Sequence, residues 1–311
     1  MSFSHREDNR DGRVVDVLTS EETGLRLVVS RLGAELLSLA RRNEDGQWIG
    51  FLHRDNDLSA PAKGWANHAT VMGYFLHRLK NERSTYRGRT IEGGSHGFLR
   101  SKQWHFLPGA PEQGRLSYQV TRSDFTETQY PLDLSLCLSY AIESETARVT
   151  FTFQNHEPEL TAHVGFGLHP GFAATSFDSF QFEMPAGLYR RHFSPNNFLS
   201  GETEDIQFDG GRMPFPRKKL AGSYIFELMD VPDRIFTFKD PPGGRSVTVD
   251  LAGVPYLTLW SDGGPFLCLE PCWGLTDHDQ QRAFEDKEGI QSIPACGKLQ
   301  ATFAMTPRLT S

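Results

Sequence analysis

The chain has 311 residues, of which 38% are hydrophobic, 12% aromatic and 23% charged. This length suits two modest domains or one large all-β or α/β domain, and it can bury a substantial core without disulfides or metals. The net charge is −7, from 32 basic and 39 acidic residues. Proteins that coat nucleic acid cluster lysine and arginine, so we expect no nucleic-acid partner.

Membrane insertion, secretion and disulfide bonding are not indicated. No apolar run reaches the roughly 18 residues that a membrane-spanning helix needs. The segment SHREDNRDGR, which begins at Ser4, lacks the apolar region of a signal peptide. Among the four cysteines only Cys268 and Cys272 are close in sequence, and no second pair completes a zinc set. We therefore expect buried reduced thiols, no metal, no membrane partner and a cytoplasmic location.

Short runs of alternating apolar and polar residues predict β-strands. In chain order the clearest runs are residues 25–30, 134–142, 147–154, 246–251 and 299–305. Convincing helical periodicity is scarce, and one short helix is expected at 280–289. Glycine-containing turns at 209–211 and 242–244 lie between strand-like segments and predict hairpins.

The chain shows no internal repeat, no low-complexity tract and no linker that divides it into halves. Residues 193–219 are rich in proline, asparagine, glycine and charge, and they predict a long irregular connection. We therefore predict an all-β fold, with one large antiparallel sandwich over residues 13–311 and a disordered tail over residues 1–12.

The segment HVGFGLHP, from His163 to Pro170, is the first candidate site. Alternate side chains share a face of a strand, so its three apolar side chains are expected to face the core. His163 and His169 then lie on the opposite face, with two glycines between them. Glycine weakens a strand, which suggests that something approaches the backbone closely. Relief of a bend in the sheet, with two solvated histidines, explains the segment equally well.

Glu270 is the second candidate, because it ends an otherwise apolar run that begins at Pro265. A carboxylate in such a place is either paired or has a raised pKa, and both conditions suit a general base. An edge glutamate that reaches solvent is the alternative. Trp260 and Trp273 flank the run, and aromatic rings commonly stack on the apolar faces of sugars.

Residues 72–100 form the third candidate, with five arginines and the histidines His77 and His96. Arginine offers fixed donors to hydroxyls, carboxylates or phosphates. Most of these arginines are expected on a solvated face, with one or two at most in a site.

Taken together, these segments resemble the aldose 1-epimerase (galactose mutarotase) family, and most closely its shorter LacX-like bacterial branch. Six motifs occur in order between residues 33 and 303: GAELLSL from Gly33, HRLKN from His77, SHGFLR from Ser95 with Trp104, GLHP from Gly167, PYL-LWS-LEP from Pro255 and KEGI from Lys287. Each motif alone is weak, whereas six in order are specific.

The resemblance implies a β-supersandwich that interconverts the α and β anomers of a hexose or pentose without a cofactor. Glu270 would be the general base and protonated His169 the general acid of ring opening. His96 and Arg78 would bind the sugar beside the ring oxygen, with Trp260 as a further contact. The implied partner is a small-molecule sugar, and the protein is expected to be a monomer or homodimer.

The sequence departs from the family pattern at several positions. His77 stands where the family has glycine, Gly171 where it has a large aromatic residue, and Leu99 where alanine is common. The family's sugar-binding aspartate is missing, and Ser223 or Tyr224 falls near its place.

These departures leave two alternatives open. One is a hexose-6-phosphate 1-epimerase, in which Arg100 would grip the phosphate. The other is a non-catalytic carbohydrate-binding or regulatory protein on the same fold, since a fold does not settle function. A lyase or hydrolase is disfavoured, because glycosidic chemistry needs a second carboxylate that the sequence does not indicate.

Overall fold

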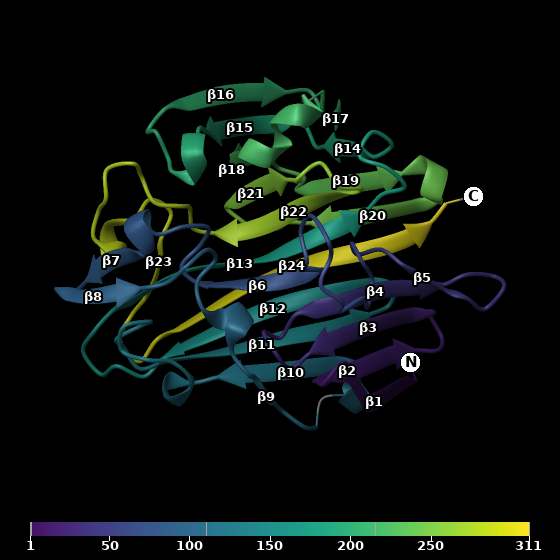
Figure 1. Cartoon of the computed structure of the whole chain (residues 1–311), viewed down its shortest axis with the longest axis horizontal. Coiled ribbons are helices and arrows are strands. Elements are labelled where there is room, and N and C mark those ends of the chain that lie inside the picture. The colour runs from purple at the N-terminus through teal and green to yellow at the C-terminus, as the bar shows by residue number, and fades with distance from the viewer. Residues whose placement is uncertain (1, 110, 215, 311) are drawn as a thin grey trace.

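The computed structural model describes residues 2–109, 111–214 and 216–310, whose regular secondary structure is mostly antiparallel β-sheet (Figure 1). Helix occurs in these residues only as short 3₁₀ segments: η1 (Lys80–Glu82), η2 (Leu99–Ser101), η3 (Pro111–Gln113), η4 (Arg122–Asp124), η5 (Pro195–Asn197), η6 (Arg217–Gly222), η7 (Pro241–Gly243) and η8 (Phe284–Asp286). None of the described helices is long and apolar enough to span a membrane. The all-β prediction is confirmed.

In Figure 1 the five-stranded sheet lies in the lower right part of the molecule, and the nine-stranded sheet extends from β9 (His105–Phe106) at the bottom to β17 (Gly211–Arg212) at the upper right. The five-stranded sheet is a meander of β1 (Phe3–Arg10), β2 (Arg13–Ser20), β3 (Leu25–Ser30), β4 (Leu36–Arg42) and β5 (Trp48–Gly50). The nine-stranded sheet has the order β17, β14 (Gln181–Met184), β19 (Ile235–Asp240), β20 (Arg245–Asp250), β24 (Lys298–Leu309), β12 (Thr146–Asn155), β11 (Leu134–Glu143), β10 (Arg115–Val120) and β9.

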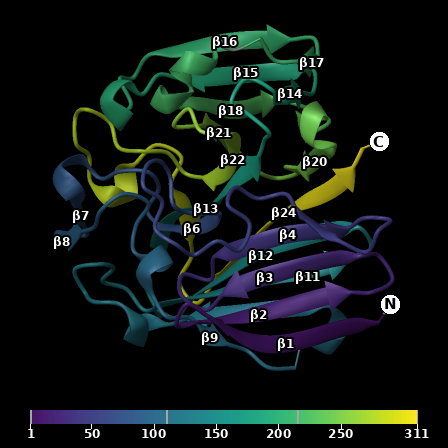
Figure 2. The same cartoon turned by 45° about the vertical axis from the view of Figure 1, so that its right-hand side comes forward.

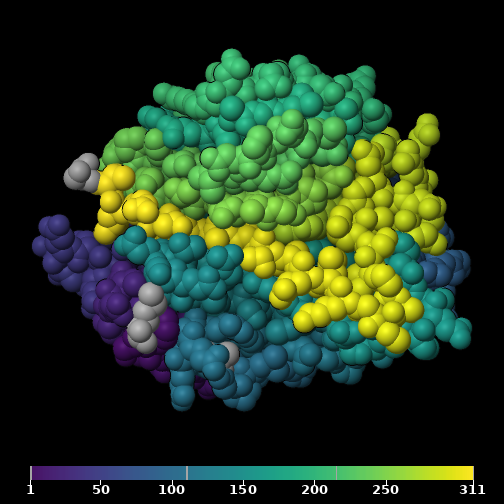
Figure 3. Space-filling view, turned by 180° about the vertical axis from the view of Figure 1, so that it is seen from behind, coloured from purple at the N-terminus to yellow at the C-terminus, as the bar shows by residue number. Residues whose placement is uncertain are grey.

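The third large sheet carries both catalytic candidates. Its eight strands are β16 (Thr203–Phe208), β15 (Gly187–His192), β18 (Tyr224–Asp230), β21 (Tyr256–Trp260), β22 (Phe266–Trp273), β13 (Ala162–Ala173) and β23 (Gln291–Ile293), with β6 (Ala69–Tyr74) also paired to β13. A separate hairpin consists of β7 (Arg83–Tyr86) and β8 (Arg89–Glu92). In Figure 2, β15, β16 and β18 lie at the top and the five-stranded sheet at the bottom. From behind, the C-terminal residues form a yellow band between these two regions (Figure 3).

Strands β12 and β13 bring the nine-stranded and eight-stranded sheets into contact. The ring of Phe166 on β13 lies 4.7 Å from that of Phe153 on β12, and it stacks on Trp273 at 5.1 Å. Val164 and Leu168 are fully buried in the same core, as their alternation predicts. The core fixes one face of β13, so the residues between these positions face the other side of the sheet.

The predicted tail over residues 1–12 is wrong, because β1 pairs with β2 along its whole length. The residue pattern does not indicate this strand, because its side chains are mostly polar and exposed. Two alternate side chains of β1 contact polar residues of the same sheet or beside it. Nε2 of His5 lies 2.9 Å from Asp16, and Glu7 accepts a hydrogen bond from Arg31 at 2.6 Å.

Other local predictions had mixed outcomes. The turn at 242–244 joins β19 to β20 as a hairpin, whereas the turn at 209–211 connects strands of two different sheets. The predicted helix at 280–289 is wrong, since only η8 forms around the buried Phe284. The irregular connection at 193–219 contains β16, which pairs with β15. All four cysteines are free thiols, but only Cys268 and Cys272 are fully buried.

Candidate active site

Strand pairing brings His169 and Glu270 together. Gly167 on β13 pairs with Cys272 on β22, and this register sets His169 directly opposite Glu270. Directly opposed side chains on antiparallel strands are close neighbours. Nε2 of His169 lies 3.2 Å from Oε1 of Glu270, and both side chains are buried. The two residues that the sequence singled out separately therefore form one close acid/base pair.

A cavity of about 260 Å³ opens on this pair. It is lined by all six of the residues expected from the sequence: Glu270, His169, His96, Arg78, Arg100 and Trp260. The rest of its lining includes His77, Ser95 and Ser223, which belong to segments singled out from the sequence, and four residues that the sequence did not indicate: Trp65, Asn67, Thr70 and Asn197. A larger hollow of about 580 Å³ shares Asn197 and Ser223 with it, but contains neither His169 nor Glu270. The candidate catalytic residues therefore lie in the smaller cavity.

Burial favours the uncharged forms of the cavity side chains. Desolvation lowers the pKa of His169 to about 3 and raises the pKa of Glu270 well above its ordinary value. It also lowers the pKa of His77 to about 4 and that of His96 well below its ordinary value. Nδ1 of His96, Nδ1 of His169 and Oε2 of Glu270 are buried atoms without a hydrogen-bond partner among the described residues. These three atoms can bind a polar ligand, because buried polar groups are normally hydrogen-bonded.

The cavity wall contains four non-glycine residues in left-handed backbone conformation. His77, His96, Asn197 and Ser223 have φ angles of 51°, 62°, 68° and 60°. Each such residue costs on the order of 1 kcal/mol or more, and residues of this kind concentrate at functional sites. This part of the wall therefore consists of residues outside the strands whose conformation is held by their surroundings.

Trp65 is the main site residue that the sequence did not reveal. Its ring stacks on His169 with centroids 4.9 Å apart and meets Trp260 edge-on at 6.0 Å. The backbone N–H of Trp65 donates a hydrogen bond to Oδ2 of Asp262 at 2.7 Å, and this bond fixes the loop that carries Trp65. A Cβ atom at Gly171 would lie 2.5 Å from the Trp65 ring. Trp65 thus fills the space of the aromatic residue that the family pattern has at position 171.

Arg78 and Arg100 bring positive charge to the cavity. Within the described parts of the chain, neither guanidinium makes a hydrogen bond or an ion pair. Desolvation, followed by the nearby charge of Arg78, lowers the pKa of Arg100. By contrast, Arg83 pairs with Glu92 at 3.5 Å, as expected for an arginine on a solvated face. The two cavity arginines are therefore available to an anionic or hydroxyl-rich ligand.

The segment that carries Arg78 is held by the closing motif of the sequence. Asp277 donates its backbone N–H to the Arg78 carbonyl at 3.1 Å, and its Oδ2 accepts the N–H of Lys80 at 2.7 Å. Lys287, from the KEGI motif, forms a buried ion pair with Asp277. The motif thus supports the arginine from outside the cavity.

Two other candidate residues lie outside the site. His163 hydrogen-bonds with the hydroxyl of Tyr86 at 3.2 Å, away from the cavity, and Trp273 belongs to the core. The close approach that the glycines indicated is made by the protein itself, because a Cβ at Gly167 would lie 2.4 Å from the carbonyl oxygen of Pro271. Of the two histidines in this segment, only His169 is in the cavity.

Comparison with known proteins gives a consistent result. Protein LacX (chromosomal) of Lactococcus lactis subsp. lactis is 24% identical over 285 residues, which cover 84% of this chain and 89% of LacX. A galactose mutarotase related enzyme from Lactobacillus acidophilus superimposes with a TM-score of 0.83 at 22% identity, covering 99% of this chain and 98% of that one. A galactose mutarotase-like protein from Lactobacillus casei gives a TM-score of 0.81 at 22% identity, covering 94% and 100%.

These likenesses define the fold as that of the galactose mutarotase-like proteins, as the sequence predicted. Residues 16–205 match the sequence profile of the aldose 1-epimerase family. The chain belongs to the aldose 1-epimerase family.

Proposed function

We propose that the protein is an aldose 1-epimerase, a mutarotase that interconverts the α and β anomers of a hexose or pentose. The observation that carries this proposal is the buried His169–Glu270 pair, 3.2 Å apart beside a polar cavity. With a volume of about 260 Å³, the cavity is smaller than the range of about 300–1,000 Å³ typical of drug-sized ligands. This size suits a monosaccharide better than a longer glycan.

The pair supplies the two proton transfers that mutarotation needs. Glu270 takes the proton from the anomeric hydroxyl while His169 gives a proton to the ring oxygen, and the bond between C1 and the ring oxygen breaks. Rotation about C1–C2 and reversal of the transfers give the other anomer. In the empty site burial favours a neutral Glu270 and a neutral His169. A sugar hydroxyl that donates to Glu270 favours its carboxylate, so the proton of the pair moves to His169.

The rest of the cavity binds and orients the sugar. Trp65 and Trp260 offer apolar ring faces, while His96 and Arg78 line the same cavity and can donate to the ring oxygen and hydroxyls of a sugar. Ser223 lies in the wall, near the place of the missing family aspartate. Its hydroxyl accepts hydrogen bonds from a sugar but without the charge of a carboxylate, so binding is weaker there.

The test is anomer equilibration followed by polarimetry or anomer-resolved NMR. Fresh α-glucose, α-galactose and glucose 6-phosphate are each compared with wild-type protein and with Glu270→Gln. Acceleration by the wild type that is lost in Glu270→Gln, while sugar binding persists, supports the proposal. Absence of acceleration across a broad sugar panel contradicts it and favours a binding protein on the same fold.

A hexose-6-phosphate 1-epimerase is the second candidate, favoured by the two cavity arginines. A phosphate bound by Arg78 and Arg100 gives charge-assisted hydrogen bonds that salt weakens, whereas binding of a neutral sugar is insensitive to salt. Arg100→Gln then raises KM for glucose 6-phosphate and leaves KM for glucose nearly unchanged. An equal effect on both sugars argues against a phosphate site.

A further inference from the structure

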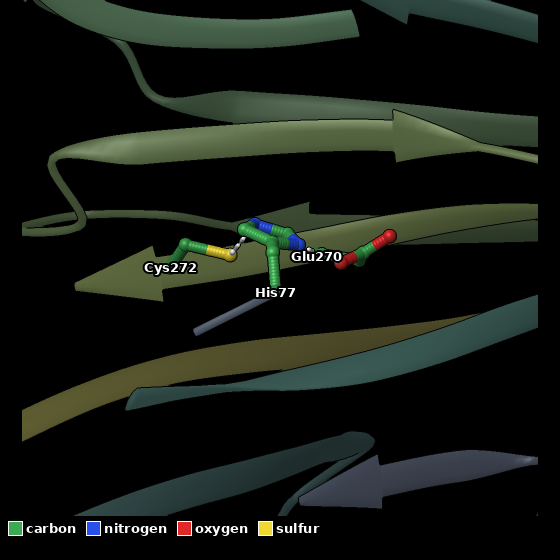
Figure 4. A group of neighbouring side chains, drawn as sticks. All are labelled: His77, Glu270 and Cys272. Carbon is green, nitrogen blue, oxygen red and sulfur yellow. Dashed lines mark hydrogen bonds and ion pairs between the residues drawn. The ribbon is translucent and has the colours of Figure 1, made fainter. Parts of the chain in front are cut away.

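Glu270 faces a second group of side chains through its other carboxylate oxygen. While Oε1 is directed at His169, Oε2 lies 4.0 Å from Nδ1 of His77. On the other side of the His77 ring, Nε2 lies 4.0 Å from Sγ of Cys272 (Figure 4). Glu270 is 1% exposed and Cys272 is fully buried, so the three groups meet away from bulk solvent.

Two features single out this group from ordinary buried polar contacts. Oε2 of Glu270 has no hydrogen-bond partner among the described residues. His77 has a φ of 51°, in the region that favours glycine, at the position where the family pattern has glycine. An imidazole held there against its backbone preference indicates a role for the side chain.

We propose that His77, Glu270 and Cys272 bind a thiophilic divalent metal ion, with Zn²⁺ as its representative, and that the bound metal inhibits the enzyme. One nitrogen, one oxygen and one sulfur are a donor set that Zn²⁺ accepts, with the fourth tetrahedral position open to water. The sequence did not predict this site because His77 lies far along the chain from the other two ligands.

The geometry needs only small side-chain movements. One ligand atom from each residue lies within 4.8 Å of the others. Tetrahedral zinc bonds of about 2.0–2.3 Å set ligand atoms roughly 3.3–3.8 Å apart, so the atoms must close by at most about 1.0–1.5 Å. Metal binding releases two protons to solvent: the thiol proton of Cys272 as the sulfur–metal bond forms, and the proton that burial favours on Glu270 as its carboxylate coordinates.

The inhibitory consequence rests on the proposed function, whereas the metal site itself does not. A metal that coordinates Glu270 removes the carboxylate that would accept the anomeric proton. Free metal and sugar therefore compete for the same residue. Cys268 is the matched control, because it is a fully buried thiol on the same strand and does not belong to this group.

The experiment is titration of chelator-treated protein with Co²⁺, which reports a thiolate ligand through its near-ultraviolet charge-transfer band, followed by displacement with Zn²⁺. We expect one equivalent to bind in the wild type and in Cys268→Ser, with the band absent in Cys272→Ser. Loss of the imidazole in His77→Gly is expected to weaken metal binding about tenfold or more. At metal sites, removal of a residue that only supports a ligand already weakens metal binding by about this factor. Glycine suits the backbone at position 77, so this variant tests the site even if Cys272→Ser does not fold.

Three results overturn the site: no band in the wild type, a band retained in a folded Cys272→Ser, or a band lost in Cys268→Ser. Inhibition is measured separately, as the ratio of the rates of each protein with and without Zn²⁺. Strong inhibition of the wild type and Cys268→Ser, but not of His77→Gly, supports the inhibitory role. Equal inhibition of all three refutes that role. If no protein accelerates anomer exchange, the proposed function fails, and the cobalt titration still decides the site.

Discussion

The closest test of the acid/base pair is a double-mutant cycle on His169 and Glu270. Glu270→Gln keeps the shape of the side chain but cannot accept a proton, and His169→Asn keeps a hydrogen-bonding group without an imidazole. A positioned general acid or base contributes about 10²–10⁴ in rate. Because Nε2 of His169 and Oε1 of Glu270 are 3.2 Å apart and the proposed mechanism moves one proton between them, we expect either variant to disable the whole pair.

The double variant is therefore expected to be about as slow as either single variant, since residues that act as a unit are not additive. Suppose that each single change lowers the rate about 10³-fold, which is about 4 kcal/mol. Independent action of the two residues then predicts a loss of about 10⁶ in the double variant, whereas action as a unit predicts about 10³. The two cases therefore differ by about 4 kcal/mol. The assay is polarimetric equilibration with the spontaneous rate subtracted. His163→Asn makes the same substitution on the same strand outside the cavity, and its rate should match the wild type. Losses that multiply would refute a shared proton.

Three further predictions follow from the described geometry. In chelator-treated protein the rate should stay level over a broad pH range. It should fall in acid, because His169 has a pKa of about 3 and there adds a second proton to the pair. It should also fall in alkali, because the pair loses its proton through the raised pKa of Glu270. A narrow optimum near the ordinary pKa values would contradict this. Gly171→Ala should push the Trp65 ring away and raise KM more than it lowers kcat, and unchanged kinetics would show that the ring does not contact the sugar. Asp240→Asn should destabilise the protein by about 1–3 kcal/mol in denaturant unfolding, because the fully buried Asp240 loses the charge that pairs with the partly exposed Arg245, and a loss below about 0.5 kcal/mol would argue against that pairing.

The parts of the site that the sequence predicted are those on regular strands. Alternation fixed which side of β13 faces the core, and this placed His169 on the opposite side. The apolar run before Glu270 marked its strand in the same way. Neither pattern contains the register between the two strands, so their contact followed only from the family resemblance and from the structure.

The residues that the sequence missed lie where local pattern does not determine position. Trp65 and Asn67 belong to an irregular segment whose place depends on long-range contacts, such as the hydrogen bond from Trp65 to Asp262. Strand β1 was missed for another reason. Its exposed, charged side chains resemble a solvated tail, and the pairing with β2 is made by the backbone.

One departure from the family pattern, at position 171, is compensated by a residue from another segment. Trp65 occupies the volume that an aromatic residue at position 171 would fill, so the ring over His169 is retained from a different segment. No carboxylate from another segment replaces the missing aspartate, because Glu270 is the only carboxylate among the described residues that line the cavity.

This absence changes the charge balance of the cavity. With Arg78 and Arg100 in the wall and no second carboxylate, the cavity is more positive than one that keeps the aspartate. Positive charge in a partly enclosed site strengthens binding of anions and does little for a neutral sugar. The ratio of kcat/KM for glucose 6-phosphate to that for glucose therefore measures the effect of the missing aspartate directly. A ratio well above one that falls with added salt favours the phosphorylated sugar, whereas a ratio near one at all salt concentrations favours the neutral sugar.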